Sequence, residues 1–266
     1  MILAAWAFMR EGFRTAAQYR AEVLARMLQG PVYLVMWLSL WYAVYASPFR
    51  PAGAPPLVET LTYVLVVEFL ATLLADDWIL QEIFERLRSG DVALDLIRPV
   101  PLPLRLVAHQ TGHASFFLLF TALPIYGLIA LGMRLPMPTG LEVWTAFAGF
   151  ALLAHLTRRL IEMCLGLTAF WITEAHGLSD ILDFITVLFG GRIVPLWFYP
   201  PWLVSVAGYL PFRGIYFVPA AIFVGRLQPD AWGAAALVQF LWILTLGLLA
   251  HWLWRRAVTR VVVQGG

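Results

Sequence analysis

Residues 57–78 read LVETLTYVLVVEFLATLLADDW, and residues 79–105 continue as ILQEIFERLRSGDVALDLIRPVPLPLR. The first stretch is apolar over about the 20 residues that a helix needs to cross a bilayer. The second stretch mixes apolar and charged residues at helical spacing before it ends in prolines. This order predicts a membrane span that is followed directly by an amphipathic helix outside the bilayer.

The composition extends this prediction to the whole chain. Of its 266 residues, 61% are apolar and 13% are charged, whereas soluble proteins contain about 45–50% and about 25%. One soluble core cannot bury this excess, so we expect an all-α membrane protein with a single transmembrane domain over residues 1–266. Six spans are predicted, at about 31–46, 57–78, 107–131, 142–173, 181–198 and 231–254.

The residue types that are absent exclude several classes of function. The chain has no lysine and no asparagine, so it cannot hold a P-loop lysine, a Schiff base or an N-glycosylation site. Cys164 is the only cysteine, which excludes an internal disulfide. The net charge of +2 indicates no nucleic-acid partner. Because HExxH and GxSxG motifs are also missing, we expect neither catalytic activity nor a bound cofactor on this chain.

All 18 basic residues are arginines, and their distribution predicts the orientation. Eleven lie before the first span, between the second and third spans, or after the sixth span. Four lie in the alternate loops, at Arg50, Arg134, Arg213 and Arg226. The positive-inside rule therefore places both termini in the cytoplasm. The lack of residues with A-rich codons points to a GC-rich genome, so we expect a multi-pass protein of the bacterial cytoplasmic membrane.

Residues 3–29 are predicted to form a helix that lies on the membrane surface. Trp6, Met9 and Phe13 recur at three- and four-residue spacing, while Arg10 falls on another face. Aromatic residues on one face and arginines on another are typical of an interfacial helix. An amphipathic helix that packs against a partner protein is the alternative.

Residues 79–105 form the longest segment on the predicted cytoplasmic side. Phe84 and Leu87 lie on the apolar face of the predicted helix, and Arg88 lies on the polar face. Gly90 fits a helix stop, and the prolines that follow prevent the helix from continuing into the third span. Such a helix suits docking in a groove of a soluble protein. A helix that rests on lipid headgroups is the alternative.

Residues 190–229 are apolar, but prolines and glycines interrupt them too often for one continuous helix. Aromatic residues such as Trp197, Tyr199 and Trp202 suit the membrane interface. Irregular backbone at membrane depth is tolerated only against protein or water. We therefore expect broken, re-entrant helices that dip into the outer leaflet and form an outer cap or gate.

Charged residues inside the predicted spans need a partner or water, because a charge at the membrane centre costs about 2.5–3.5 kcal/mol. Arg158 and Glu162 are four residues apart in the fourth span and can pair on one face, beside Arg159. Glu68 lies midway along the second span. These residues either line a polar pathway or form structural pairs between helices, and both interpretations stay open.

Two motifs in these segments resemble signatures of a known transporter family. Residues 89–100 read SGDVALDLIRPV, and residues 190–202 read GGRIVPLWFYPPW, with LPF at 210–212 and YFVP at 216–219. Together with the order of elements, they resemble the permease subunits of type-2 ATP-binding-cassette (ABC) exporters. The resemblance is to a bacterial subfamily described as uncharacterised or multidrug permeases, and it covers essentially the whole chain.

The resemblance implies a half-transporter that moves a drug, a lipid or another amphiphile. The chain would pair with an identical or paralogous permease and with a cytoplasmic ABC ATPase dimer that binds ATP and Mg²⁺. The helix in residues 79–105 would be the coupling helix that carries ATP-driven motion into the spans. It would contact the ATPase through Phe84, Leu87, Arg88, Gly90, Asp91 and Leu94. The outer gate would comprise Gly191, Pro195, Trp197 and Phe212, and the pathway would be lined by Glu68 and Glu162.

Two other functions are compatible with the sequence. A secondary transporter driven by an ion gradient would use Glu68 and Glu162 as proton carriers. A membrane scaffold would transport nothing. Only the exporter hypothesis requires a separate ATPase with a Walker lysine.

Overall fold

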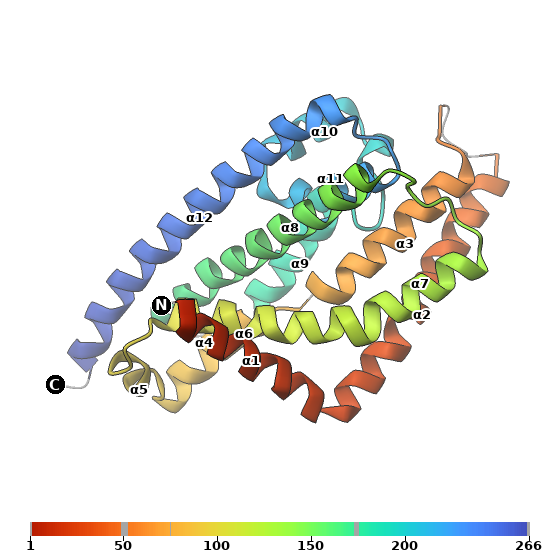
Figure 1. Cartoon of the computed structure of the whole chain (residues 1–266). Coiled ribbons are helices and arrows are strands. Elements are labelled where there is room, and N and C mark those ends of the chain that lie inside the picture. Colours follow the sequence, from red (N-terminus) through yellow and green to blue (C-terminus); the bar gives the residue numbers. More distant parts are fainter. Residues whose placement is uncertain (1, 49–52, 75, 173–175, 265–266) are drawn as a thin grey trace.

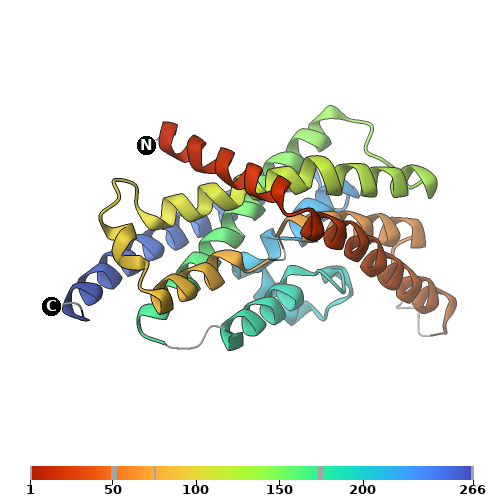
Figure 2. The same cartoon turned by 90° about the horizontal axis from the view of Figure 1, so that it is seen from below.

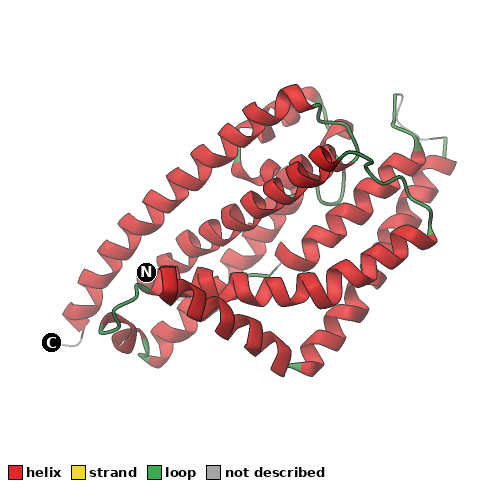
Figure 3. Cartoon of the chain, in the orientation of Figure 1, coloured by secondary structure: helices red, strands yellow, loops and turns green. Residues whose placement is uncertain are grey.

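A computed structural model describes residues 2–48, 53–74, 76–172 and 176–264, so Arg50 lies outside the described residues. Within these ranges the chain consists of helices joined by turns and loops, and no strand occurs (Figure 3). This confirms the predicted all-α class. The helices of the first half are α1 (Ile2–Gln18), α2 (Arg20–Ala46), α3 (Leu57–Leu74), α4 (Trp78–Ser89), α5 (Val92–Leu96), α6 (Leu102–Phe117), the π-helical turn η1 (Leu118–Ala122) and α7 (Leu123–Gly132). Those of the second half are α8 (Leu141–Leu167), η2 (Thr168–Phe170), α9 (His176–Gly190), η3 (Leu196–Phe198), α10 (Pro201–Tyr209), η4 (Pro211–Gly214), α11 (Phe217–Phe223) and α12 (Pro229–Gln264).

The N-terminal segment breaks earlier than predicted. α1 ends at Gln18, and α2 begins at Arg20 and continues through Pro31 into the first span. Residues 20–29 therefore belong to the same helix as the first span, and one surface helix over 3–29 is a wrong prediction. Pro31 removes one backbone hydrogen bond, and α2 nevertheless continues through it to Ala46.

α1 packs along α6 and runs in the same direction (Figures 1 and 2). Near the start of both helices, the guanidinium carbon of Arg105 lies 5.9 Å from the ring centroid of Phe8. Further along, the rings of Phe13 and Phe116 meet edge to face, with 5.4 Å between their centroids. The predicted amphipathic helix therefore has its inner face covered by the chain itself.

A glycine lets the backbones of α1 and α6 approach closely. A Cβ atom at Gly112 would overlap the carbonyl oxygen of Met9. The first turns of α1 expose large apolar side chains, with Leu3 84% exposed and Trp6 63% exposed, whereas Arg10, Glu11 and Arg14 are exposed further along the helix. Large apolar side chains on the outside of a membrane protein are suited to contact with lipid.

Four helical stretches among the described residues are long and apolar enough to cross a membrane. They are Ala21–Ala46, Leu57–Ser89, Leu102–Gly132 and Pro229–Arg260. A bent pair, Pro201–Tyr209 with Pro211–Phe223, is a fifth if it forms one span. α8 has the length of a span but carries charged residues. α9 stops at Gly190, so residues 181–198 do not form the predicted fifth span as one helix.

α3 occupies the centre of the bundle, where Tyr63, Val67 and Leu70 are fully buried. α2 packs on α3, and α12 packs along α8 (Figure 1). The α4–α5 segment lies at the same end of the bundle as the first turns of α1 and the last turns of α12 (Figures 1 and 2). The last turns of α2 and α7 lie at the opposite end of the bundle, away from the α4–α5 segment.

Between α9 and α12 the chain forms the short helices predicted for residues 190–229. α10 and the η4–α11 segment meet at an angle of 85°. The residues of α11 from Val218 to Phe223 are buried, and α11 packs on α8 and α3. The Gln239 side chain of α12 donates a hydrogen bond to the Gly214 carbonyl at 2.7 Å. α11 and Gly214 of η4 are therefore covered by protein, whereas α10 is exposed at Trp202 and Tyr209.

The substitution Gly112→Ala should loosen α1 from α6, because the added methyl group overlaps the Met9 carbonyl oxygen. Overpacking of this kind costs about 1–3 kcal/mol, so the thermal midpoint of the purified protein in detergent should fall. Gly127→Ala is the matched control, since nothing lies within 4 Å of its added Cβ. Equal midpoints for the two variants would contradict the close approach of these helices.

Candidate functional site

We call residues 76–101 the elbow. The apolar face of its helix α4 packs against the chain itself. A Cβ at Gly166 of α8 would fall 2.7 Å from Ile83 Cδ1, which shows how closely the two helices pack. Phe84 is 5% exposed and packs with Leu80 against α8 and η2. The expectation that this face enters a groove of another protein is therefore wrong, because the same chain covers Phe84.

Asp95 fastens α5 to the rest of the elbow. Its carboxylate is 1% exposed and accepts hydrogen bonds from Arg86, at 3.1 Å, and from Arg105 at the start of α6. Arg98 lies 3.8 Å from the same carboxylate. A buried charge that loses its partners is costly, so Asp95 holds α4, α5 and α6 together. Sequence analysis missed this role, and its only signal is an acidic residue that lies between Arg88 and Arg98 in the sequence.

The exposed surface of the elbow lies around its tip. Gly90 ends α4 in a left-handed conformation with φ of 82°, which favours glycine. Beyond this turn, Leu94 is 54% exposed and Ile97 is 80% exposed. Leu87 is half-buried against the core. Four of the predicted coupling residues are exposed: Arg88, Gly90, Asp91 and Leu94.

A buried ion network joins α8 to the start of the elbow. Arg158 Nε donates to one oxygen of Glu162 at 2.7 Å, and Arg159 Nη1 donates to the other at 2.8 Å. Arg159 Nη1 also donates at 2.6 Å to Asp76, which lies between α3 and α4. The three α8 side chains are at most 1% exposed. The pairing of Arg158 with Glu162 that their spacing predicted is confirmed.

The same network reaches α9 and α2. Arg158 donates to Asp183 of α9 at 2.8 Å and to Thr186 at 3.1 Å. Arg26 of α2 lies 3.6 Å from Asp76. With Glu22, which lies 2.9 Å from Arg26, three arginines face four carboxylates, so each arginine of the network is engaged. Because breaking one buried pair leaves an uncompensated charge, the network opposes separation of α2, α8, α9 and the start of the elbow.

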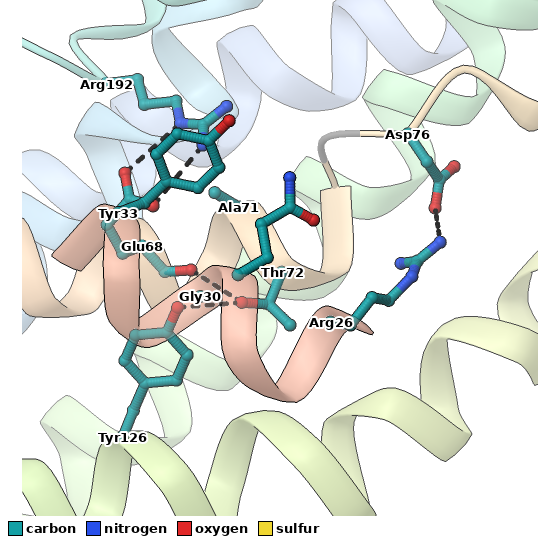
Figure 4. A pocket seen from close by; sticks show the side chains of 10 residues that line it. Arg26, Gly30, Tyr33, Glu68, Ala71, Thr72, Asp76, Tyr126 and Arg192 are labelled. Atoms are coloured by element: carbon teal, nitrogen blue, oxygen red, sulfur yellow. Dashed lines mark hydrogen bonds and ion pairs between the residues drawn. The ribbon is translucent and has the colours of Figure 1, made fainter. Parts of the chain in front are cut away.

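A polar pocket of about 200 Å³ lies between α2, α3 and α7 (Figure 4). Glu68 is 3% exposed and faces Arg192, with 3.5 Å between the guanidinium nitrogens and the carboxylate oxygens. The hydroxyl groups of Tyr126 and Thr72 lie 3.1 Å apart in the same pocket. Glu162, the second predicted pathway residue, does not line it, because Arg158 and Arg159 hold that side chain in the ion network.

The predicted gate residues Gly191 and Trp197 meet at Tyr63 of α3. The Tyr63 hydroxyl donates to the Gly191 carbonyl at 2.8 Å, and its ring lies 4.7 Å from the ring of Trp197. Gly191 has φ of 71°, a conformation that larger residues rarely adopt. Pro195 precedes η3, the turn that carries Trp197, and Phe212 in η4 packs against the core. Sequence analysis did not identify Tyr63, because one tyrosine in an apolar span is an ordinary interior residue.

The fold defines a multi-pass helical membrane protein with a polar pocket between its membrane-length helices. The family model for ABC-2 family transporter proteins matches residues 31–265, and the chain belongs to this family. It is therefore a permease component of an ABC transporter, and membership of this family implies association with an ABC ATPase. The match includes both motif-bearing segments that carried the resemblance. No curated protein matches the chain.

The substitution Arg159→Leu should destabilise the protein by about 3–5 kcal/mol, because it leaves Asp76 and Glu162 buried without their shared partner. The thermal midpoint in detergent measures this loss. Arg255→Leu, at an exposed position of α12, makes the same chemical change outside the network and should have little effect. A wild-type midpoint for Arg159→Leu would show that the network does not hold these segments together.

Proposed function

We propose that the chain is the permease subunit of an ATP-driven ABC exporter in the bacterial cytoplasmic membrane, with both termini in the cytoplasm. A separate ATPase dimer binds ATP and Mg²⁺, and a second permease, identical or paralogous, completes the pathway. Membership of the ABC-2 family supports this proposal. The absence of lysine agrees with it, because ATP-driven transport by a chain without a Walker lysine needs a separate subunit that binds and hydrolyses ATP.

The observation that carries the proposal is that ion pairs hold the elbow both at its beginning and at its tip. Asp95 ties its tip to α6 through Arg105. Asp76 ties its beginning to α8 through Arg159. Since buried charge pairs are costly to separate, a push from the ATPase on the tip moves α6 and α8 instead of bending a loose loop. The elbow is then the coupling element.

The buried ion network of α8 also connects the elbow to the gate and would transmit the movement. Arg158 of α8 holds Asp183 of α9, and α9 ends at Gly190, directly before the gate. Movement of α9 relative to α3 changes the contact between Tyr63 and Gly191. In this mechanism, ATP-driven motion of α8 and α9 opens the outer cap.

Two pockets beside α3 support an amphiphilic substrate such as a drug or a lipid. Glu68 lines the polar pocket, and its neighbour Phe69 lines an apolar pocket of about 370 Å³ between α3, α6 and α8. Adjacent residues of one helix thus border one polar and one apolar space. A molecule with a polar head and an apolar body matches this division.

The ion-gradient alternative is less well supported. Glu68 faces Arg192, and Glu162 is held by two arginines. A proton carried by either carboxylate would first have to replace an arginine partner. In proteoliposomes that contain the permease and its ATPase, efflux of an amphiphilic dye should require ATP and persist when an uncoupler abolishes the proton gradient. Loss of efflux with the uncoupler would favour the ion-gradient transporter, and no efflux or ATPase stimulation would favour a scaffold.

The double substitution Leu94→Asp and Ile97→Asp should abolish co-purification with the ABC ATPase, because it places charges on the exposed apolar tip of the elbow. The fold should persist, since neither side chain is buried. Met137→Asp is the matched control, as Met137 is an exposed apolar residue in the loop between α7 and α8. An intact complex with the double variant would refute the assignment of the tip as the docking surface.

A further inference from the structure

A small pocket of about 220 Å³ lies between the η4 turn and the first turns of α12. Arg213 lines it from η4, and Gln239 and Trp242 line it from α12. Hydrogen bonds fix its walls, because Gln239 donates to the Gly214 carbonyl at 2.7 Å and Trp242 Nε1 donates to the Tyr209 carbonyl of α10 at 3.1 Å. The pocket is therefore held open between elements that are tied to one another.

Arg213 carries a positive charge that the described part of the chain does not balance. The side chain is only partly exposed, yet it makes no ion pair or hydrogen bond with any described residue. Its guanidinium carbon lies 5.4 Å from the ring centroid of Phe217, a contact that uses none of its N–H donors. No carboxylate is among the described residues that line the pocket.

Two neighbouring arginines on the same side of the bundle are paired. Arg192 faces Glu68, and Arg226 is held by Glu59. Arg213 therefore differs from them in having no acidic partner within the described chain. A charge that is partly removed from water without a partner is costly, so the pocket favours an anion that would supply the missing partner.

The accessible donors of Arg213 lie at the wall of the pocket. Nε is buried without a hydrogen-bond partner, whereas the two Nη atoms are not buried. Nη1 lies beside Gly208, another residue that lines the pocket, since a Cβ at Gly208 would be 3.8 Å from it. A planar guanidinium with two free Nη groups matches the paired oxygens of a phosphate.

The surroundings of the pocket indicate that the phosphate belongs to a lipid. Trp202 and Tyr209 of α10 are exposed, and exposed tryptophan and tyrosine are typical of the membrane–water interface. On α12, Leu237 and Leu241 are exposed next to residues that line the pocket. A phosphate at Arg213 thus lies at headgroup level, with an apolar surface for its acyl chains along α12.

We propose that Arg213 binds the phosphate of a phospholipid headgroup in this pocket. Phe212, one of the predicted gate residues, precedes Arg213 in η4, and a Cβ at Gly190 would lie 3.3 Å from the Phe212 carbonyl oxygen. Bound lipid therefore holds η4, and with it Phe212, in place beside α12. The site does not rest on the proposed exporter function, because its ligand is a component of the surrounding bilayer.

Native mass spectrometry and thermal unfolding of the purified full-length protein in detergent test the proposal. Phosphatidylglycerol should be retained on the protein and should raise its thermal midpoint. Diacylglycerol with the same acyl chains lacks the phosphate and should do neither. Glycerol phosphate lacks the acyl chains and should have a smaller effect at the same concentration. An effect of diacylglycerol or of glycerol phosphate equal to that of phosphatidylglycerol would overturn the proposal of a headgroup site.

Substitutions locate the binding. Arg213→Gln should weaken retention of phosphatidylglycerol at least about tenfold, as expected for the loss of hydrogen bonds from a charged group. Ala234→Leu narrows the pocket from its α12 wall and should weaken retention while Arg213 stays in place. Arg134→Gln is the matched control, because it makes the same change of charge at an exposed position between α7 and α8 and should retain the lipid.

The midpoint of Arg213→Gln without lipid should match the wild-type value, since Arg213 has no ion pair to lose. Wild-type retention in Arg213→Gln, or the same loss in Arg134→Gln, would overturn the proposal. If Arg213→Gln lowers the midpoint without lipid, Ala234→Leu decides, and wild-type retention in that variant would then overturn the site.

Discussion

Charges in a membrane protein must be paired or hydrated, and this constraint organises the structure. α8 carries Arg158, Arg159 and Glu162 with almost no exposed surface. Glu162 alone cannot balance two arginines, so Asp76 and Asp183 complete the set from other segments. Satisfying the charges of one helix therefore draws the start of the elbow and α9 onto it. A cost of several kcal/mol for each unpaired buried charge explains why these connections persist.

The elbow follows the same rule on a smaller scale. Asp95 is buried among arginines of α4 and α6, which turns a short loop helix into a rigid projection. The apolar face of α4 is buried against α8. The exposed apolar side chains of the elbow are therefore at its tip, at Leu94 and Ile97. Ion pairs at the beginning and at the tip, together with exposed apolar side chains at the tip, suit the coupling role that we propose for the elbow. A polar cavity of about 460 Å³ lies beside Arg105 at the base of the elbow.

Periodicity and spacing predicted a good part of this arrangement. The apolar excess predicted an all-helical membrane protein, the four-residue spacing predicted the pair of Arg158 with Glu162, and the prolines of residues 190–229 predicted short, broken helices. The prediction that Phe84 docks on another protein failed for a physical reason. Periodicity identifies which face of a helix is apolar but not which surface covers it, and here the covering surface is α8.

The sequence by itself determined the class of the protein, because an excess of apolar residues and the absence of lysine follow from composition alone. It also determined which charges needed partners. Only the tertiary structure decided which residues pair with those charges. Asp76 lies more than eighty residues before Arg159, and Asp183 lies more than twenty after Arg158. No local pattern encodes such contacts, since the folding of α3, α8 and α9 into one bundle brings them within hydrogen-bond distance.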